Sequence, residues 1–467
     1  MPLSFIAIFS ISFFIFAVKR LEWAVLSVIF ALPLYVVRFK FFVLPSTLLE
    51  IMILSVFAAW LFFYSDIPSL SKSKAGVKAF LARQGRTRYP FDTEIILLAL
   101  ISFLSVAFAG FSSNAFGIWK AYFFEPLLLY VVVFNVFKDK DLTKLIWPMA
   151  LSAIVVSLLA VYQKFTGAFI ENEFWRNPET RRATSVFGYP NAVGLYLAPL
   201  AMIFSSFISK LWSEKKKNFL QISILALAVV SSLSAVYSAK SEGALIGIIA
   251  GLFVMCLFSG KALRVAAIGV AAIGTVLVLS VPAAREYALE KALLKDLSGE
   301  IRKQQWRETF EMMNGSRAVF GTGLDSYKKA IEPFHQEGIF FNKDKDSDFR
   351  RKIVIFDERY KLKYWQPTEV YHYPHNIILN FWTELGVAGA MLFAWLIGRF
   401  FYYGIALAGK EIEDKLLVIG LIGAMAAITV HGLVDVPYFK NDLSAMFWIL
   451  FAMLGILKVR QELKEPS

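Results

Sequence analysis

The chain has 467 residues, of which 57% are hydrophobic and 18% charged, and its formal net charge is +13. A soluble protein of this length could not bury so much apolar surface, so the composition excludes the soluble globular class. In a membrane protein, this positive charge predicts cationic loops that face the cytoplasm and anionic lipid headgroups, and no nucleic-acid partner. Cys256 is the only cysteine, which excludes an intrachain disulfide and a thiolate metal site.

Apolar runs follow one another along the chain, and a run of about 18 to 22 residues is long enough to cross a hydrocarbon core of about 30 Å. Thirteen runs are centred near Ser10, Ser27, Ile53, Ile101, Leu128, Val155, Leu200, Leu227, Ile249, Gly269, Phe393, Gly423 and Ile449. The first two are short. Counted as one crossing they give twelve helices with Met1 inside, whereas thirteen crossings put Met1 outside. The sequence therefore predicts an all-α, polytopic membrane protein with about 12–13 transmembrane helices.

Lysine and arginine gather in alternate connections, at residues 72–88, 138–144, 210–217, 261–264, 410–415 and 458–464. The positive-inside bias predicts that all of these face the cytoplasm. Residues 166–189 and a long polar segment then fall outside, and the polar segment is expected to be partly helical near residues 286–313. We divide the chain into N-terminal transmembrane helices (1–282), a large extracytoplasmic loop (283–374) and C-terminal transmembrane helices (375–467).

The helix after the polar segment is predicted to begin at YHYPHN, where Pro374 suits the first turn because its missing N–H costs nothing there. The positive potential of a helix N-terminus would keep the His375 imidazole neutral and available as a base. Gly386 and Gly389 follow eleven and fourteen residues later, on the same helical face as His375. Small residues allow close helix packing, so this face is expected to turn into the bundle. The alternative is that His375 and Asn376 only cap the helix.

Further polar residues lie on the same predicted side of the membrane. Arg181 and Arg182 precede GYPNAVGLYLAP, and His431 and Asp435, four residues apart, are expected to share a helix face. A forked guanidinium matches phosphate oxygens, so the arginines indicate a phosphate ligand, with ordinary headgroup contact as the alternative. Glu384 lies inside an apolar run, where a carboxylate needs a partner or a wet cavity.

Several well-known site motifs are absent from the sequence. There is no G-x-x-x-x-G-K-[ST] loop, no H-E-x-x-H and no G-x-S-x-G. The GTGLDSY stretch at residues 321–327 follows no strand of a βαβ unit and is predicted to be a turn. The four histidines lack the spacing of metal ligands, so we expect a metal-independent chemistry without a cofactor.

Four motifs, in order, resemble the O-antigen ligase and polymerase superfamily. His375, Asn376, Gly386 and Gly389 match its H-[NSQ]-x9-G-x2-[GTY] signature. RRATSVFGYPNAVGLYLAP resembles the stretch in which an external arginine precedes an Asn-Pro-Asn-like helix start. Arg302, followed by a tryptophan four residues later and then by GTGLDSY, resembles the R-x3-W…G-x-G-x3-[FY] stretch of the large external loop. HGLVDVPYF resembles the helix near the C-terminus whose outer end carries an aspartate.

The resemblance spans about residue 181 to the C-terminus and contains one departure. Where many relatives read Ser-Arg-Gly-Ala at an external helix start, this chain reads Ser241-Glu242-Gly243-Ala244, with Lys240 nearby. If the family arginine contacts diphosphate, Lys240 could replace it only as a point charge, or donor binding differs here.

The resemblance implies a GT-C-type glycosyltransferase in the bacterial cytoplasmic (inner) membrane. It would move a glycan from an undecaprenyl-diphosphate carrier onto an acceptor hydroxyl at the outer face, as in polysaccharide and lipopolysaccharide biosynthesis for the cell envelope. A sugar diphosphate already has a good leaving group, so the enzyme needs chiefly cations and a base. On this reading His375 is the base, and the substrate contacts come from Arg181, Arg182, Arg302, Asn376, His431 and Asp435. Direct in-line displacement would invert the anomeric carbon.

Several alternatives stay open at this point. The acceptor can be a lipid A core, another lipid-linked glycan or a protein, which gives a ligase, a polymerase or an O-linked protein oligosaccharyltransferase. A transporter or flippase for lipid-linked sugars would predict internal repeats and polar residues near the bilayer midplane. The Ser-Glu-Gly-Ala departure is also compatible with an inactive structural relative.

Overall fold

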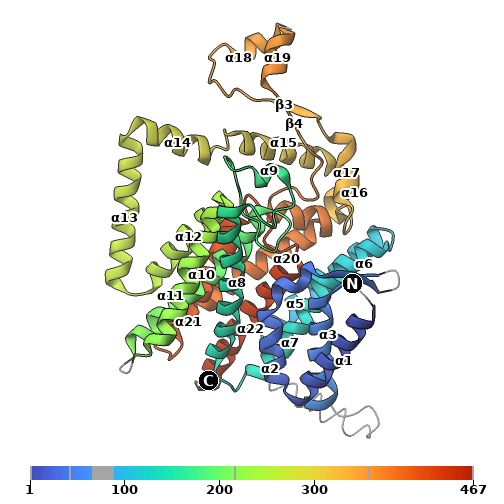
Figure 1. Ribbon diagram of the computed structural model, residues 1–467, viewed down its shortest axis with the longest axis vertical. Helices are drawn as coiled ribbons and strands as arrows, with labels where there is room; N and C mark the ends of the chain where they lie inside the picture. The colour runs from blue at the N-terminus through green and yellow to red at the C-terminus, as the bar shows by residue number, and fades with distance from the viewer. Residues whose placement is uncertain (1–2, 42–43, 66–88, 215–216, 356, 465–467) are drawn as a thin grey trace.

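The structure, a computed structural model, describes residues 3–41, 44–65, 89–214, 217–355 and 357–464. In these residues a bundle of apolar helices carries the polar residues 283–374, hereafter the cap segment, across one end (Figure 1). The strands of the described residues form two short antiparallel pairs, β1–β2 and β3–β4. The connection 72–88, which was predicted to be cytoplasmic, lies outside the described residues.

The first part of the bundle contains a hairpin between its helices. Its elements are α1 (Leu3–Lys19), α2 (Leu21–Phe30), η1 (Leu32–Val36), β1 (Arg38–Phe41), β2 (Leu44–Thr47), α3 (Leu48–Ala59), η2 (Trp60–Tyr64), α5 (Asp92–Phe108), α6 (Ser113–Trp119), η3 (Lys120–Phe124) and α7 (Glu125–Phe137). The hairpin pairs Arg38 with Thr47. The Thr47 hydroxyl then caps α3 by accepting a hydrogen bond from the backbone N–H of Glu50, at 3.3 Å.

The middle part supplies the helices that reach the cap segment. Its elements are η4 (Leu142–Leu145), α8 (Ile146–Thr166), α9 (Glu173–Arg176), α10 (Pro190–Ser213), α11 (Phe219–Ala239), α12 (Glu242–Phe258) and α13 (Lys261–Ser280). Pro190 is the first residue of α10, as the sequence predicts, because proline suits the first helical position. In Figure 1, α13 stands at the edge of the molecule, and none of its residues is buried. Its apolar side chains therefore suit contact with lipid.

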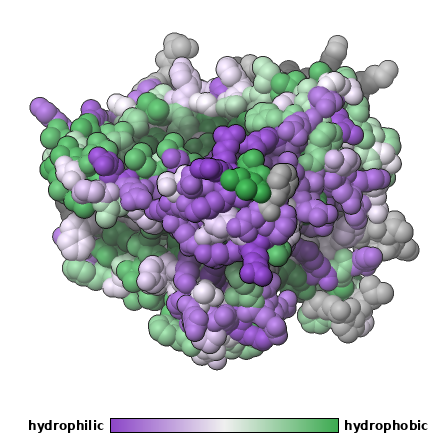
Figure 2. Space-filling model, turned by 90° about the horizontal axis from the view of Figure 1, so that it is seen from above, coloured by the Kyte–Doolittle hydropathy of each residue, from purple (hydrophilic) through white to green (hydrophobic). Residues whose placement is uncertain are grey.

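The cap segment is built from short elements. They are α14 (Pro282–Ala292), α15 (Leu297–Met312), α16 (Ser316–Phe320), α17 (Tyr327–Ile331), η5 (Glu332–Phe334), β3 (Gly338–Phe340), α18 (Phe349–Val354), α19 (Glu358–Tyr364) and β4 (Trp365–Pro367). The helical stretch predicted over residues 286–313 is thus two helices. Seen from this side, hydrophilic residues gather over the middle of the face (Figure 2). Such a surface suits contact with water and lipid headgroups rather than burial in hydrocarbon.

The last three helices include the centre of the bundle. They are α20 (Ile377–Ala408), α21 (Lys415–His431) and α22 (Asn441–Lys464). Every residue of α22 from 441 to 457 is buried. A helical stretch that is apolar on all sides belongs in the interior, and residues 445–457 of α22 have this composition.

The predicted crossings correspond to helices of the structure. All thirteen predicted centres fall inside helices. Among the described residues, seven helices are long and apolar enough to cross a membrane, and five shorter apolar helices accompany them. The first two runs are separate helices. With 10 residues, α2 extends only about 15 Å and is too short to cross by itself. The chain is an all-α, polytopic membrane protein.

The prediction of one regular helix through His375, Gly386 and Gly389 was wrong. The helix begins at Ile377, and Gly386 interrupts it with φ +76° and ψ −178°. His375 precedes the helix with φ +46°, so the helical-face argument that joined it to the two glycines does not apply. Pro374 likewise lies before the helix rather than in its first turn. A Cβ at Gly386 would come within 2.3 Å of the Val319 carbonyl oxygen, so glycine is needed for the docking of the cap segment.

Candidate functional site

A cavity of about 790 Å³ lies between the cap segment and the ends of α10, α12 and α21. Its ionisable lining residues are Arg182, Lys240, Glu242, Lys291, Asp296, Arg302, Glu369, His372, His375, His431 and Asp435. Five of the seven site residues predicted from the sequence are in this set: His375, Arg182, Arg302, His431 and Asp435. Residues far apart in the chain thus converge at one end of the bundle.

His375 is held by α15 of the cap segment. Trp306 donates its indole N–H to the carbonyl oxygen of Pro374, at 2.7 Å, and Gln305 donates its side-chain N–H to the carbonyl oxygen of Tyr373. This second bond turns the Gln305 amide oxygen towards His375, where Oε1 lies 2.8 Å from Nδ1. Because an amide oxygen only accepts, Nδ1 carries the hydrogen and Nε2 keeps a free lone pair.

The surroundings of His375 favour the neutral imidazole. Burial lowers the pKa of His375 below its ordinary value of 6.5, the charge of Asp435 opposes this shift, and the charge of Arg302 adds to it. The sequence argument assigned the neutral state to the positive end of a helix. In the structure, His375 stands outside the helix, and burial is the main cause of its lowered pKa.

Asn376 is the N-cap of α20. Its Oδ1 accepts hydrogen bonds from the backbone N–H groups of Ile378 and Leu379, both at 3.0 Å, and its Nδ2 donates to the carbonyl oxygen of Leu433. These contacts occupy the side chain, and Asn376 does not line the cavity. The capping alternative therefore fits Asn376, whereas His375 lines the cavity.

A chain of polar contacts joins Arg182 to His431. Arg182 donates to the carbonyl oxygen of Ala239 at 2.9 Å and to Oδ1 of Asn191 at 2.8 Å. Asn191 in turn donates to Oδ2 of Asp435 at 3.0 Å, and this carboxylate oxygen lies 4.0 Å from Nε2 of His431. Because α21 ends at His431, the predicted sharing of one helix face by His431 and Asp435 is wrong; a turn joins them instead. The bridging contact of Asn191, which belongs to the GYPNAVGLYLAP stretch, was not predicted from the sequence.

Arg302 belongs to the cap segment but faces the cavity. It stands one helical turn before Trp306, on the same face of α15. Its Nη1 donates to the hydroxyl of Ser298 at 2.9 Å, whereas its Nε is buried and has no hydrogen-bond partner in the described residues. Burial lowers the pKa of Arg182, and the nearby positive charge of Arg302 contributes to this shift. Two guanidinium groups therefore line one cavity, where an anionic ligand would offset their like charges.

Arg181 lies outside the cavity, contrary to the sequence prediction. Its guanidinium donates to the carbonyl oxygens of Lys164 (3.2 Å), Phe165 (3.0 Å) and Arg176 (3.1 Å). It thereby ties the end of α8 to the following loop. Adjacent residues of an extended chain point to opposite sides, so of the two neighbouring arginines only Arg182 reaches the cavity.

Lys291 is a cavity residue that the sequence analysis did not identify. Its ammonium contacts both carboxylate oxygens of Glu242 at 2.8 Å and Oδ2 of Asp296 at 2.9 Å. Burial disfavours the charged form, but the two carboxylates outweigh it and raise the pKa of Lys291. Glu242, the departure from the family pattern, thus has a partner on the cap segment. In sequence Lys291 is one of many cap lysines, and no local signal distinguishes it.

The chain was compared with known protein families and with curated proteins. The model of the family described as O-Antigen ligase matches residues 225–394, a range that includes Arg302 and His375. No curated protein matches the chain. Residues 225–394 are therefore similar to the O-antigen ligase family, which confirms the resemblance to this superfamily that the motifs predict.

Proposed function

We propose that this membrane protein is a glycosyltransferase that moves a glycan from an undecaprenyl-diphosphate carrier onto an acceptor hydroxyl. The observation that carries the proposal is the placement of His375, whose Nε2 has no hydrogen-bond partner among the described residues, in the same cavity as two guanidinium groups. The family match supports glycosyl transfer in general. The carrier, the active site at the outer face of the bacterial inner membrane, and the independence from metal are parts of the proposal.

The chemistry follows from the groups in the cavity. Nε2 of His375 takes the proton of the acceptor hydroxyl, whose oxygen attacks the anomeric carbon. The bond between that carbon and the diphosphate oxygen breaks, and the diphosphate leaves with the electron pair. Arg302 and Arg182 stabilise the developing negative charge. Arg302 is the better candidate for direct contact because Arg182 already donates to Ala239 and Asn191. Attack opposite the leaving group inverts the anomeric carbon.

The surroundings of Glu384 bear on the transport alternative. A transporter would need polar groups near the bilayer midplane, and the sequence predicts Glu384 as such a group. Its carboxylate accepts a hydrogen bond from the backbone N–H of Asp325 at 2.9 Å. Glu384 therefore serves to anchor the cap segment, and the remaining candidate residues lie at one end of the bundle.

A transfer assay tests the proposal. Membranes that contain the chain should consume an undecaprenyl-diphosphate-linked glycan without ATP. The His375→Gln variant should lose about 10² to 10⁴-fold in rate, the usual contribution of a general base. His335→Gln is a matched control, because His335 lies in the cap segment outside this cavity and contacts Glu308 and Thr368. Its rate should stay near that of the wild type. A His375→Gln variant with normal turnover would refute the assignment of the base.

A further inference from the structure

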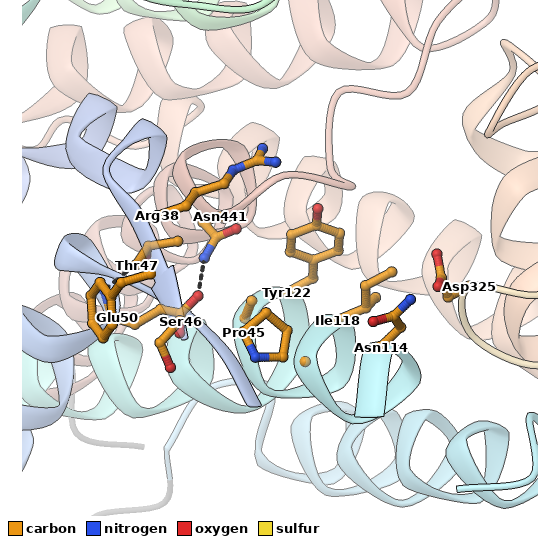
Figure 3. A pocket seen from close by; sticks show the side chains of 13 residues that line it. Arg38, Pro45, Ser46, Thr47, Glu50, Asn114, Ile118, Tyr122, Asp325 and Asn441 are labelled. Atoms are coloured by element: carbon orange, nitrogen blue, oxygen red, sulfur yellow. Dashed lines mark hydrogen bonds between the residues drawn. The ribbon is translucent and has the colours of Figure 1, made fainter. Parts of the chain in front are cut away.

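A second cavity, of about 230 Å³, lies beside the β1–β2 hairpin. The rings of Tyr122, Phe439 and Tyr373, hereafter the aromatic wall, connect it to the cavity that contains His375. Its polar lining comes from four separate parts of the chain, and Figure 3 shows the side chains of Arg38, Asn114, Tyr122, Asp325 and Asn441 around it. Ligand cavities commonly measure about 300–1,000 Å³, so this one suits a single small ring rather than a whole glycan.

Hydrogen bonds and close packing fix the orientation of polar groups that line this cavity. Glu50 is buried and accepts hydrogen bonds from Nδ2 of Asn441 at 2.8 Å and from Nζ of Lys120 at 2.6 Å. Because Nδ2 of Asn441 is bound in this way, its Oδ1 points away from Glu50 towards the cavity, as Figure 3 shows. A Cβ at Gly117 would come within 2.6 Å of Pro45, so α6 packs directly on the hairpin. Such preorganised groups lose little entropy when a ligand binds.

The cap segment completes the cavity through the GTGLDSY stretch. The predicted turn is confirmed, with Gly321 and Gly323 at φ +79° and +87°. Thr322 donates its backbone N–H to the carbonyl oxygen of Thr383, and the Glu384 carboxylate accepts from the N–H of Asp325. These contacts bring the Asp325 side chain, which is exposed, to the rim of the cavity.

The lining chemistry indicates a neutral, hydroxyl-rich ligand. Each hydroxyl group both donates and accepts. The cavity offers acceptors on Asp325 and Asn441, a donor on Arg38, and both on Asn114. Among the described residues that line the cavity, Arg38 is the single cation, and Glu50 and Asp325 are the two carboxylates. Lys120, next to the cavity, is already bound to Glu50 and Ser46. The charges around the cavity therefore balance and leave no excess of cations to bind a phosphate, whereas a neutral sugar needs none.

The aromatic wall links this cavity to the site at His375. The ring of Tyr122 meets that of Phe439 edge-on, with centroids 6.3 Å apart, and Phe439 meets Tyr373 with centroids 6.0 Å apart. Tyr373 lines the first cavity and stands two residues before His375. We propose that the second cavity binds one ring of a neutral saccharide that takes part in the transfer. Its place in the reaction rests on the proposed function, but the binding itself does not.

A binding experiment tests the site independently of catalysis. Full-length protein in lipid nanodiscs is applied to an array of neutral, phosphorylated and uronic-acid-containing oligosaccharides. The wild type should bind at least one neutral oligosaccharide, and both Asn114→Leu and Arg38→Gln should weaken this binding at least about tenfold. Ser113→Leu is the matched control, because Ser113 is exposed on the same turn of α6 and does not line the cavity. Absence of neutral-sugar binding, preference for charged sugars, or equal binding by Asn114→Leu would overturn the site.

A transfer assay on the same variants identifies the source of the sugar. If the ring belongs to the acceptor, Asn114→Leu should raise the KM for the acceptor about tenfold and leave the KM for the donor unchanged. A rise in the donor KM alone would instead assign the cavity to a distal sugar of the donor glycan. Unchanged values for both substrates would overturn its part in the reaction. A protein that binds the sugar through Asn114 and transfers nothing would refute the proposed function and leave the binding site standing.

Discussion

Nδ1 of His375 lies 2.8 Å from Oε1 of Gln305, a residue seventy positions earlier in the cap segment. The contact fixes the tautomer, so that the proposed base presents Nε2 to the cavity. Gln305 also donates to the carbonyl oxygen of Tyr373, which orients its amide. Gln305 is therefore a positioning residue that acts through His375.

Replacing Gln305 by glutamate should move the pH dependence of transfer to higher pH. A carboxylate beside the imidazole stabilises its protonated form and raises the pKa of His375, and the protonated form cannot act as a base. In the wild type, burial lowers this pKa, so the midpoint of the fall in rate on acidification should lie below pH 6.5. The measurement is kcat/KM as a function of pH. Gln366→Glu, the same change in β4, should leave the profile unchanged. An unaltered profile in Gln305→Glu would show that this contact does not tune His375.

The arginines should differ in their tolerance of lysine. Arg302→Lys keeps the positive charge but loses the forked N–H donors of the guanidinium. The transfer rate should fall by about 10²-fold, the usual effect of losing one preorganised hydrogen-bond donor. Arg182→Lys should lose rate and also thermal stability, because its bonds to Ala239 and Asn191 join two segments. Arg181→Lys serves as the control, since Arg181 lies outside the cavity. Equal losses of rate in Arg181→Lys and Arg302→Lys would refute this division of roles.

The orientation in the membrane can be measured directly. In a chain with Cys256→Ser, a Ser347→Cys variant should react with a membrane-impermeant maleimide in intact cells, because Ser347 is exposed on the cap segment. An Asp139→Cys variant should react only after permeabilisation, because Asp139 lies in a basic connection predicted to be cytoplasmic. Labelling in the opposite order would invert the predicted orientation.

The sequence predicted the apolar helices well because length and hydropathy determine them locally. Each of the thirteen predicted centres lies in a helix, and the start of α10 at Pro190 was also predicted. The interruption at Gly386 could not be predicted from periodicity. Its cause is the backbone near Val319, more than sixty residues earlier, which approaches too closely for any Cβ.

The candidate site was predicted in part, and the errors share one cause. Residue type identified arginines, histidines and an aspartate, but it could not tell which way neighbouring side chains point. Arg181 binds backbone carbonyl groups, whereas Arg182 lines the cavity. Gln305, Lys291 and Asn191 carry contacts across tens or hundreds of residues, and such pairings leave no local pattern in a single sequence.

The contact between Lys291 and Glu242 should control how firmly the cap segment is held over the cavity. Lys291 lies in α14, and Glu242, the second residue of the Ser-Glu-Gly-Ala stretch, is the first residue of α12. Lys291→Glu places like charges together, so backbone amides of residues 283–296 should exchange hydrogen faster with solvent.

The charge-swapped double variant Lys291→Glu with Glu242→Lys provides the decisive comparison. It restores opposite charges across the same contact, so slow exchange at residues 283–296 should return at low salt and weaken at high salt. Lys295→Glu is the matched single control, because Lys295 is a nearby cap lysine outside the cavity lining. If the double variant exchanges as fast as Lys291→Glu, the pair does not hold the cap segment, and another contact of α14 or α15 must do so.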